Sequence, residues 1–251
     1  MRKTPDALDF SGQQVLVVGG STGIGNATAQ MFRRHGAHVQ VTGTRPGASD
    51  YRAEEISDLK GIDYARLDLS DRSALEQWAP PFSTLNVLVM CHAHTVFDGG
   101  EFDADTFRTV VEVNLNATFD CAKRFRPMLA ASGGSIVIVS SLAAFRTIAD
   151  QPAYTASKAA LLGLVRALSI AYASDGIRVN GIAPGLVETK MGHRGHRDFA
   201  GMIAKVVKRV PLRRTGMPKE MAGPILFLAS PLASYMIGQT LIVDGGMSLT
   251  S

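Results

Sequence analysis

Cysteine is scarce in this chain, since only Cys91 and Cys121 occur among 251 residues. Neither belongs to a Cys-x-x-Cys pair, and no histidines stand at metal-ligand spacing, so the sequence predicts no metal site. A chain of this length buries a core that needs no disulfide. We therefore expect two buried free thiols in a protein of a reducing compartment.

Long apolar runs are also missing. The most apolar segment, 159–173, is interrupted by Arg166, and no run reaches the roughly 18 apolar residues that span a bilayer. The first ten residues carry two basic side chains but no following apolar stretch, which is unlike a secretory signal. These absences predict a cytoplasmic protein with no membrane partner.

No excess of one charge dominates the chain. It has 26 Lys and Arg against 22 Asp and Glu, spread along its length, so we expect no nucleic-acid partner. Its 46% hydrophobic and 19% charged residues are typical of ordinary globular proteins. At this length we expect one domain that spans residues 1–251.

What the chain does have is an alternation of short, mostly apolar runs with longer helical patterns. This alternation is typical of βαβ units, which build a parallel sheet with helices on both faces. The sequence therefore predicts an α/β protein with a doubly wound parallel sheet of seven strands. Ligands bind such sheets at the carboxyl ends of the strands. The predicted strands are 14–18, 39–43, 64–67, 86–90, 135–140, 178–183 and 240–243, and the predicted helices are 24–35, 71–79, 103–131, 152–174 and 219–228.

A glycine-rich turn, Gly19-Gly20-Ser21-Thr22-Gly23-Ile24-Gly25, follows the first predicted strand and runs into a predicted helix. Glycines allow backbone amides to approach a pyrophosphate, and a helix N-terminus adds partial positive charge. Glycines also form simple tight turns, but a strand before and a helix after favour dinucleotide binding.

Tyr154 and Lys158 stand four positions apart near the start of a predicted helix, so they share one face of it. A free phenol has a pKa near ~10. A neighbouring ammonium and an oxidised nicotinamide lower this pKa, so that Tyr154 can exchange a proton with a ketone or an alcohol. The same pair also occurs on ordinary helix surfaces.

The Gly-x-x-x-Gly-x-Gly turn and the Tyr-x-x-x-Lys pair together resemble the short-chain dehydrogenase/reductase family, from about residue 12 to about residue 247. The resemblance implies a Rossmann-type fold and hydride transfer between a nicotinamide cofactor and a ketone or secondary alcohol. It implies a catalytic set of Asn114, Ser141, Tyr154 and Lys158, in which Asn114 holds a proton relay. Ser141 is thirteen positions before Tyr154, and this spacing favours it over Ser140. The resemblance also implies cofactor contacts by Gly19, Ser21, Thr22, Gly23, Ile24, Gly25, Asp68, Leu69, Tyr154, Lys158, Pro184, Gly185, Val187 and Thr189.

The choice between NADP and NAD is expected just after the second predicted strand, where an acid would bond the ribose of NAD. No acid stands at Gly43, whereas Thr44 and Arg45 follow and can bind a 2′-phosphate. The sequence favours NADP, with NAD as the alternative. Arg45 can also simply face solvent, and Asp68 can be a turn or cap residue.

The sequence departs from the family after the fourth predicted strand. The family has Asn-Asn-Ala-Gly where this chain has Met90-Cys91-His92-Ala93. His92 and His94 are interpreted first as packed or hydrogen-bonded side chains, then as a substrate contact by His94, and last as metal ligands or an auxiliary acid. The departure suggests an alternative function, a non-catalytic dinucleotide-binding sensor or scaffold, which the complete catalytic set argues against.

The substrate side is less well defined. Residues 190–214 carry eight Lys or Arg with His193 and His196, where the family places a mobile lid. This charge suits an acidic carrier or an anionic substrate, but it also suits a solvated helix. The apolar face of the Tyr154 helix predicts a homo-oligomer, a dimer or tetramer, with burial inside the monomer as the alternative; its residues are Leu161, Leu164, Val165 and Leu168. Expected pocket-wall residues are His94, Val96, Phe145, Gln151 and Leu186.

Overall fold

The fold is a parallel seven-stranded sheet, as the sequence predicts. In this computed structural model, which describes residues 7–189 and 199–250, the strands pair in the order β3-β2-β1-β4-β5-β6-β7. The order reverses between β1 and β4, which makes the sheet doubly wound. The strands are β1 (Gln14–Val18), β2 (His38–Gly43), β3 (Asp63–Arg66), β4 (Val87–Met90), β5 (Ser135–Val139), β6 (Arg178–Pro184) and β7 (Thr240–Val243).

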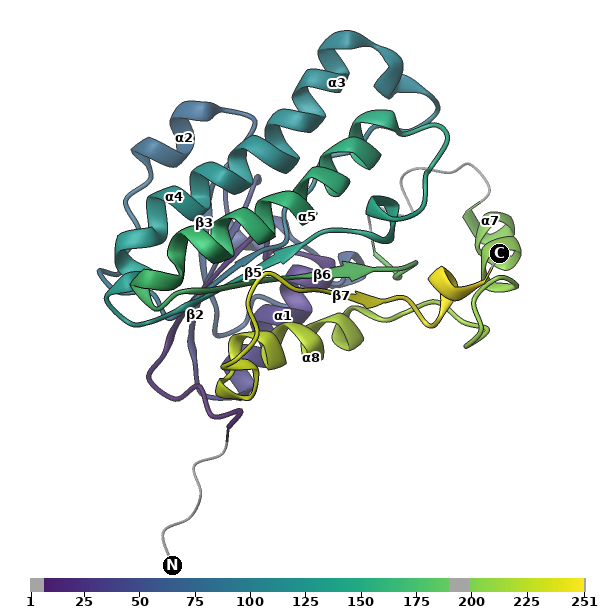
Figure 1. Ribbon diagram of the computed structural model, residues 1–251. Coiled ribbons are helices and arrows are strands. Elements are labelled where there is room, and N and C mark those ends of the chain that lie inside the picture. Colours follow the sequence, from purple (N-terminus) through teal and green to yellow (C-terminus); the bar gives the residue numbers. More distant parts are fainter. Residues whose placement is uncertain (1–6, 190–198, 251) are drawn as a thin grey trace, which may run out of the picture.

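Helices cover both faces of the sheet (Figure 1). Helices α1 (Gly23–Arg34) and α8 (Pro218–Ala229) lie on one face, and α2 (Arg72–Gln77), α4 (Ala117–Ala130) and α5 (Pro152–Tyr172) on the other. Helix α7 (Phe199–Val207) lies beyond the carboxyl ends of β6 and β7 (Figure 1).

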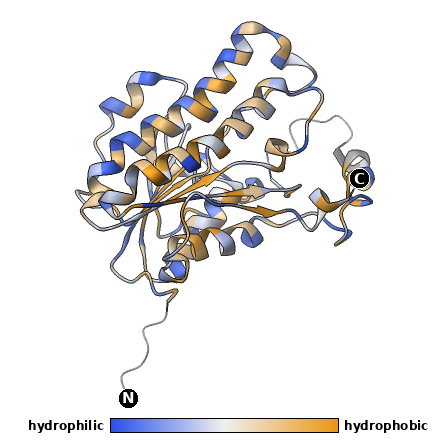
Figure 2. Ribbon diagram, viewed as in Figure 1, coloured by the Kyte–Doolittle hydropathy of each residue, from blue (hydrophilic) through white to orange (hydrophobic). Residues whose placement is uncertain are grey.

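The strands are apolar throughout because both of their faces are covered. Successive side chains point to opposite faces, so Val15 and Val17 pack toward α1 and α8, whereas Leu16 and Val18 pack toward α4 and α5. Figure 2 shows the resulting hydrophobic layer along the strands. Two cores form in this way, one on each side of the sheet.

The segment predicted as one helix, 103–131, has a more complex structure. Helix α3 (Ala104–Val111) is followed by a π-helical segment (Glu112–Asn116) and then by α4. A π-helical turn inserts an extra residue and reorients the side chains after it. Here it buries Asn114, which is 1% exposed. The predicted helix 71–79 is shorter, because Asp71 is its N-cap and accepts a hydrogen bond from the Ser73 amide.

The apolar face of α5 is buried inside the protein. Leu161, Val165 and Leu168 lie in the core against the sheet, and Leu164 packs against them, which corrects the expectation that these residues form a subunit contact. By length and composition alone, Pro152–Asp175 also meets the criteria for a membrane-spanning helix, despite Arg166. A core helix meets the same criteria.

Arg178 of β6 ties the end of α8 to the sheet. Its guanidinium donates hydrogen bonds to the carbonyl oxygens of Leu228 (2.7 Å), Ala229 (2.9 Å), Ser230 (3.2 Å) and Ala233 (3.0 Å). The last carbonyls of a helix have no partner within it. One arginine therefore satisfies several acceptors that would otherwise be buried without a donor.

We predict that Arg178→Met lowers the free energy of unfolding by about 2–4 kcal/mol, because it leaves these buried carbonyl oxygens without the guanidinium donor. Urea denaturation measures the loss. Arg72→Met is the control, since the Arg72 side chain is 75% exposed in its pair with Glu112 and such surface pairs contribute about 1 kcal/mol or less. Equal losses in the two variants would contradict the assignment.

Candidate active site

A cleft of about 1100 Å³ lies at the carboxyl ends of the strands. Ser141, Tyr154 and Lys158 line it, together with every residue predicted to contact the cofactor except Arg45. Segments far apart in the sequence therefore meet in one place, as the topology requires. Asn114 lies behind the wall of the cleft and braces it from within.

The glycine turn has the geometry of an anion cradle. Gly19 and Gly23 have φ of 75° and 57°, which favours glycine. A Cβ on Gly19 would lie 2.7 Å from the His92 backbone, and one on Gly25 would lie 2.3 Å from the Gly19 carbonyl oxygen. The N-cap residue Thr22 makes no side-chain cap, and the first turn of α1 contains no acid. The Gly23 amide donates to the Ile56 carbonyl oxygen at 2.9 Å, and the Ile24 and Gly25 amides that follow it in the first turn suit a pyrophosphate.

The end of β2 is crowded by the side chains of Tyr51 and Ser21. A Cβ on Gly43 would lie 2.3 Å from the Tyr51 hydroxyl and 2.6 Å from the Ser21 hydroxyl. Thr44 lines the cleft as expected. Arg45 does not line it, because its guanidinium forms two 2.6 Å hydrogen bonds with the Glu55 carboxylate and stacks over the Tyr51 ring at 4.5 Å.

The proposed proton donor and its neighbours are close together. The Lys158 ammonium lies 5.7 Å from the centre of the Tyr154 ring and donates to the Val139 carbonyl oxygen at 2.9 Å. Burial lowers the pKa of Lys158 to about 8. Burial also raises the pKa of Tyr154, while a hydrogen bond with Ser141 lowers it. The half-buried phenol of Tyr154 therefore lies beside the Lys158 ammonium and the Ser141 hydroxyl.

The structure distinguishes Ser141 from its neighbour Ser140. The Ser140 hydroxyl is buried and donates to the Lys158 carbonyl oxygen at 2.8 Å, so it stabilises the helix backbone. The Ser141 hydroxyl accepts from the Ala143 amide at 3.1 Å, which leaves its own proton to donate into the cleft. The spacing and the geometry thus favour the same serine.

Asn114 connects the loop after β4 to α5. Its side-chain oxygen accepts from the His94 amide at 2.7 Å, and its amide group donates to the His94 carbonyl oxygen at 2.9 Å and to the Ser157 hydroxyl at 3.0 Å. Both amide hydrogens are therefore used within the protein. Its predicted part in a proton relay stays a prediction.

His92 is a hydrogen-bonded, partly buried histidine that lines the cleft. The Thr118 hydroxyl donates to the Asn114 carbonyl oxygen, so it accepts from the His92 Nε2, 3.1 Å away, while His92 Nδ1 is buried without a partner among the described residues. Burial lowers the pKa of His92 to about 3, with help from the Lys158 charge. Among residues 7–189 and 199–250, no group of His, Cys, Asp or Glu is placed to hold a metal.

Both cysteines are free thiols; Cys121 is buried and Cys91 is partly buried. Desolvation raises the pKa of each to about 12. A thiol with so high a pKa has little thiolate at neutral pH and reacts slowly. Cys91 lines the cleft, but it contributes volume rather than a nucleophile.

The substrate end of the cleft includes three of the five expected wall residues: His94, Gln151 and Leu186. Val96 and Phe145 do not line it, whereas Arg146, Val206 of α7 and Met247 do. The expected lid, 190–214, is described only from residue 199 onward. His193, His196 and part of the basic segment therefore lie outside the described residues.

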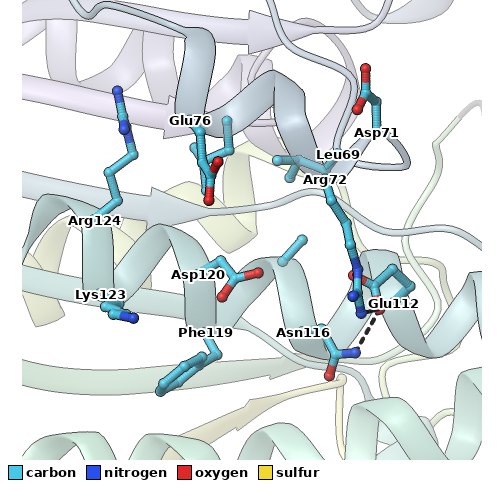
Figure 3. A pocket seen from close by; sticks show the side chains of 12 residues that line it. Leu69, Asp71, Arg72, Glu76, Glu112, Asn116, Phe119, Asp120, Lys123 and Arg124 are labelled. Atoms are coloured by element: carbon cyan, nitrogen blue, oxygen red, sulfur yellow. Dashed lines mark hydrogen bonds and ion pairs between the residues drawn. The ribbon is translucent and has the colours of Figure 1, made fainter.

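A second groove, of about 720 Å³, lies between α2 and α4 (Figure 3). Arg72 forms an ion pair with Glu112 there, and the Asn116 amide group donates to the same carboxylate at 2.7 Å. Acidic and basic side chains alternate along this groove, and it contains none of the catalytic set. Ser141, Tyr154 and Lys158 of the predicted catalytic set line the larger cleft instead.

The sequence profile of the family described as Enoyl-(Acyl carrier protein) reductase matches residues 18–248. The chain belongs to the short-chain dehydrogenase/reductase family. It is therefore an NAD(P)-dependent oxidoreductase that acts on CH–OH groups.

Relatives within the short-chain dehydrogenase/reductase family are similar over nearly their whole length. A 3-oxoacyl-[acyl-carrier-protein] reductase of Chlamydia muridarum is 36% identical, covering 93% of this chain and 96% of its own. A cis-4-hydroxycyclohexanecarboxylate dehydrogenase of Sinomonas cyclohexanicum is 34% identical, with 94% and 97% covered. A crystal structure of a 3-oxoacyl (acyl-carrier-protein) reductase from Agrobacterium tumefaciens C58 with NADP bound matches with a TM-score of 0.84 and 29% identity, covering 95% of both chains.

Sequence reasoning missed one polar group at this short-chain dehydrogenase/reductase site. Glu101 is completely buried beside the start of α5. Its sequence context, Gly-Gly-Glu-Phe before a predicted helix, resembles a solvated loop. Only the tertiary contacts of Glu101 distinguish it from the other acidic residues of the chain.

We predict that His92 makes stability fall in acid. The unfolded side chain has a pKa of ~6.5 and the folded one about 3, so the unfolded state binds more protons between these values and stability is lost as the pH falls through this window. Near pH 5 the wild type should lose about 2 kcal/mol more than His92→Gln, relative to about pH 7.5. Urea denaturation at both pH values measures this. His38→Gln, at the exposed start of β2, is the control and should behave like the wild type.

Proposed function

We propose that this short-chain dehydrogenase/reductase transfers a hydride between NADP(H) and a ketone or secondary alcohol, with Tyr154 as the general acid and base. The supporting observation is the convergence of Tyr154, Ser141 and Lys158 in one cleft with the glycine turn. The bound nicotinamide would supply or accept the hydride. The protein's residues hold the reactants and move the proton.

Each catalytic side chain has a distinct task in the reduction. Ser141 donates a hydrogen bond to the carbonyl oxygen and stabilises the negative charge that develops on it. Tyr154 transfers its proton to that oxygen. Lys158 holds a positive charge beside the phenol, which stabilises the phenolate left behind, and it binds the nicotinamide ribose as the family resemblance implies. Oxidation of an alcohol uses the same groups in reverse.

We predict that Tyr154→Phe lowers kcat by about 100-fold or more, because it removes the transferable proton, while NADPH still binds. Tyr172→Phe, near the other end of α5, is the matched control. Turnover should be measured in both directions with a 3-oxoacyl thioester, 4-oxocyclohexanecarboxylate and an aldohexose. NADPH binding with turnover no greater than that of Tyr154→Phe would instead support the dinucleotide-binding sensor or scaffold.

NADP is the proposed cofactor, supported by the lack of an acid at Gly43 and by Thr44 in the cleft. Arg45 can pair with a 2′-phosphate only by leaving Glu55. The two groups therefore compete for one guanidinium.

We predict a higher kcat/KM with NADPH than with NADH. Two substitutions should change the KM for NADPH in opposite directions. Glu55→Gln releases Arg45 and should lower the KM for NADPH several-fold, whereas Arg45→Gln should raise it, with little change for NADH in either. Steady-state kinetics with both cofactors measures this. A preference of the wild type for NADH would refute the assignment.

The wider setting follows from the family resemblance. We propose one domain of residues 1–251 with a substrate lid at about 190–214, acting in the cytoplasm on a small molecule. Since the Leu161 face of α5 is buried, a homotetramer would use the outer sides of α4 and α5, where Phe119 and Ile170 are exposed.

A further inference from the structure

Glu101 is a buried carboxylate that the mechanism above does not use. It lies in a short 3-10 helix (Gly100–Phe102) and is 0% exposed. Its Oε1 accepts hydrogen bonds from the Thr95 hydroxyl at 2.9 Å and the Val96 amide at 3.1 Å, and its Oε2 accepts from the Tyr154 amide at 2.8 Å. One carboxylate thus joins the cleft loop to the residue that carries the catalytic phenol.

These contacts are those of an ionised carboxylate. In all three the carboxylate is the acceptor, and a protonated acid would need an acceptor for its own hydrogen. Burying an unpaired charge is costly, but the Tyr154 amide belongs to the first turn of α5, where amides lack partners within the helix and a negative charge is stabilised.

Helix α5 depends on this external group for its N-terminal cap. Its N-cap residue Gln151 makes no side-chain hydrogen bond to the helix, and its first turn contains no acidic residue. Glu101 supplies from another segment both the acceptor and the charge that a capping residue normally provides. Because the capped amide is that of Tyr154 itself, any shift of the carboxylate is passed to the catalytic residue.

Glu101 also acts on the phenol electrostatically, since its negative charge raises the pKa of Tyr154. The positive charge of Lys158, which is on α5 like Tyr154, opposes the effect of Glu101 from a position 5.7 Å from the centre of the Tyr154 ring. The other titratable groups that line the cleft are Asp68 after β3, Cys91 and His92 after β4, His94 and Asp98 in the following loop, and Arg146 and Asp150 before α5.

We propose that Glu101 is a positioning residue for Tyr154: it locks the start of α5 against the loop at Thr95 and Val96, and places a fixed negative charge behind the proton donor. This charge favours the protonated phenol, which carbonyl reduction requires. The proposal rests on the proposed function of Tyr154. It adds a determinant of the pH range in which reduction occurs, because the protonated form is the one that gives a proton to a ketone.

The charge is tested with Glu101→Gln. Removing the negative charge should shift the pH profile of kcat/KM to lower pH by about half a unit or more, in both reduction and oxidation, since each depends on the same phenol. Asp175→Asn is the matched control, because Asp175 is the ion-pair partner of Arg126 just beyond the opposite end of α5. The control loses stability without moving the profile. An unchanged profile in Glu101→Gln would overturn the electrostatic part.

The positioning is tested with Glu101→Asp, which keeps the charge but shortens the reach by one methylene. We expect kcat to fall about tenfold, with the pH profile kept near that of the wild type. Wild-type kcat and KM in this variant would overturn the positioning part. If Glu101→Gln does not fold, this variant decides the proposal, with Asp175→Asn again correcting for any general loss of stability.

A measurement without turnover separates this proposal from the proposed function. Tyrosines labelled with carbon-13 at the ring carbon that bears the hydroxyl report their ionisation by NMR, and Tyr154→Phe identifies the Tyr154 signal. The Tyr154 titration should move to lower pH in Glu101→Gln and stay in place in Asp175→Asn. This shift is expected even if no substrate is turned over, whereas its absence in an active enzyme refutes the role of Glu101 alone.

Discussion

The parallel pairing of β1 with β4 is the interaction on which the site depends. Val18 pairs with Met90 at the ends of these strands, so the glycine turn that follows β1 and the loop that follows β4 start side by side. The strand order reverses at this pair, and crossover helices therefore leave to opposite faces and open a cleft between them. The contact is close enough that a Cβ on Gly19 would collide with His92.

Polar side chains fix the position of helix α5, which carries Tyr154 and Lys158. Its apolar face alone would allow small shifts along the sheet, since hydrophobic contacts are not directional. Asn114 binds Ser157, Ser140 binds the Lys158 backbone, and Glu101 binds the Tyr154 amide. Each of these groups is buried and hydrogen-bonded, so moving the helix would leave a polar group unsatisfied at a cost of about 1–3 kcal/mol. These buried hydrogen bonds therefore give α5 one defined position along the sheet.

In the stretch from Met90 to Ala93, where the sequence departs from the family pattern, the structure shows which contacts hold the chain. Met90, the last residue of β4, is buried in the core on the side of the sheet that α4 and α5 cover. His92 bonds to Thr118 of α4 and is kept neutral by burial. The loop is held instead through backbone groups, since Asn114 bonds to both the amide and the carbonyl of His94. The π-helical segment thus holds the loop that forms this wall of the cleft, through the contacts of Asn114.

The sequence by itself determined the sheet, its seven strands and most of the cofactor cleft, because these depend on local patterns: apolar runs, glycines that only a tight turn requires, and residues at strand ends. Ser141, Tyr154 and Lys158 were found through the resemblance of their spacing to the motifs of the short-chain dehydrogenase/reductase family. Tertiary structure alone decided which side chains pair across segments. It turned Arg45 toward Glu55, buried the Leu161 face inside the protein and brought Glu101 to Tyr154. These outcomes depend on distances between residues far apart in the chain, which no local pattern encodes.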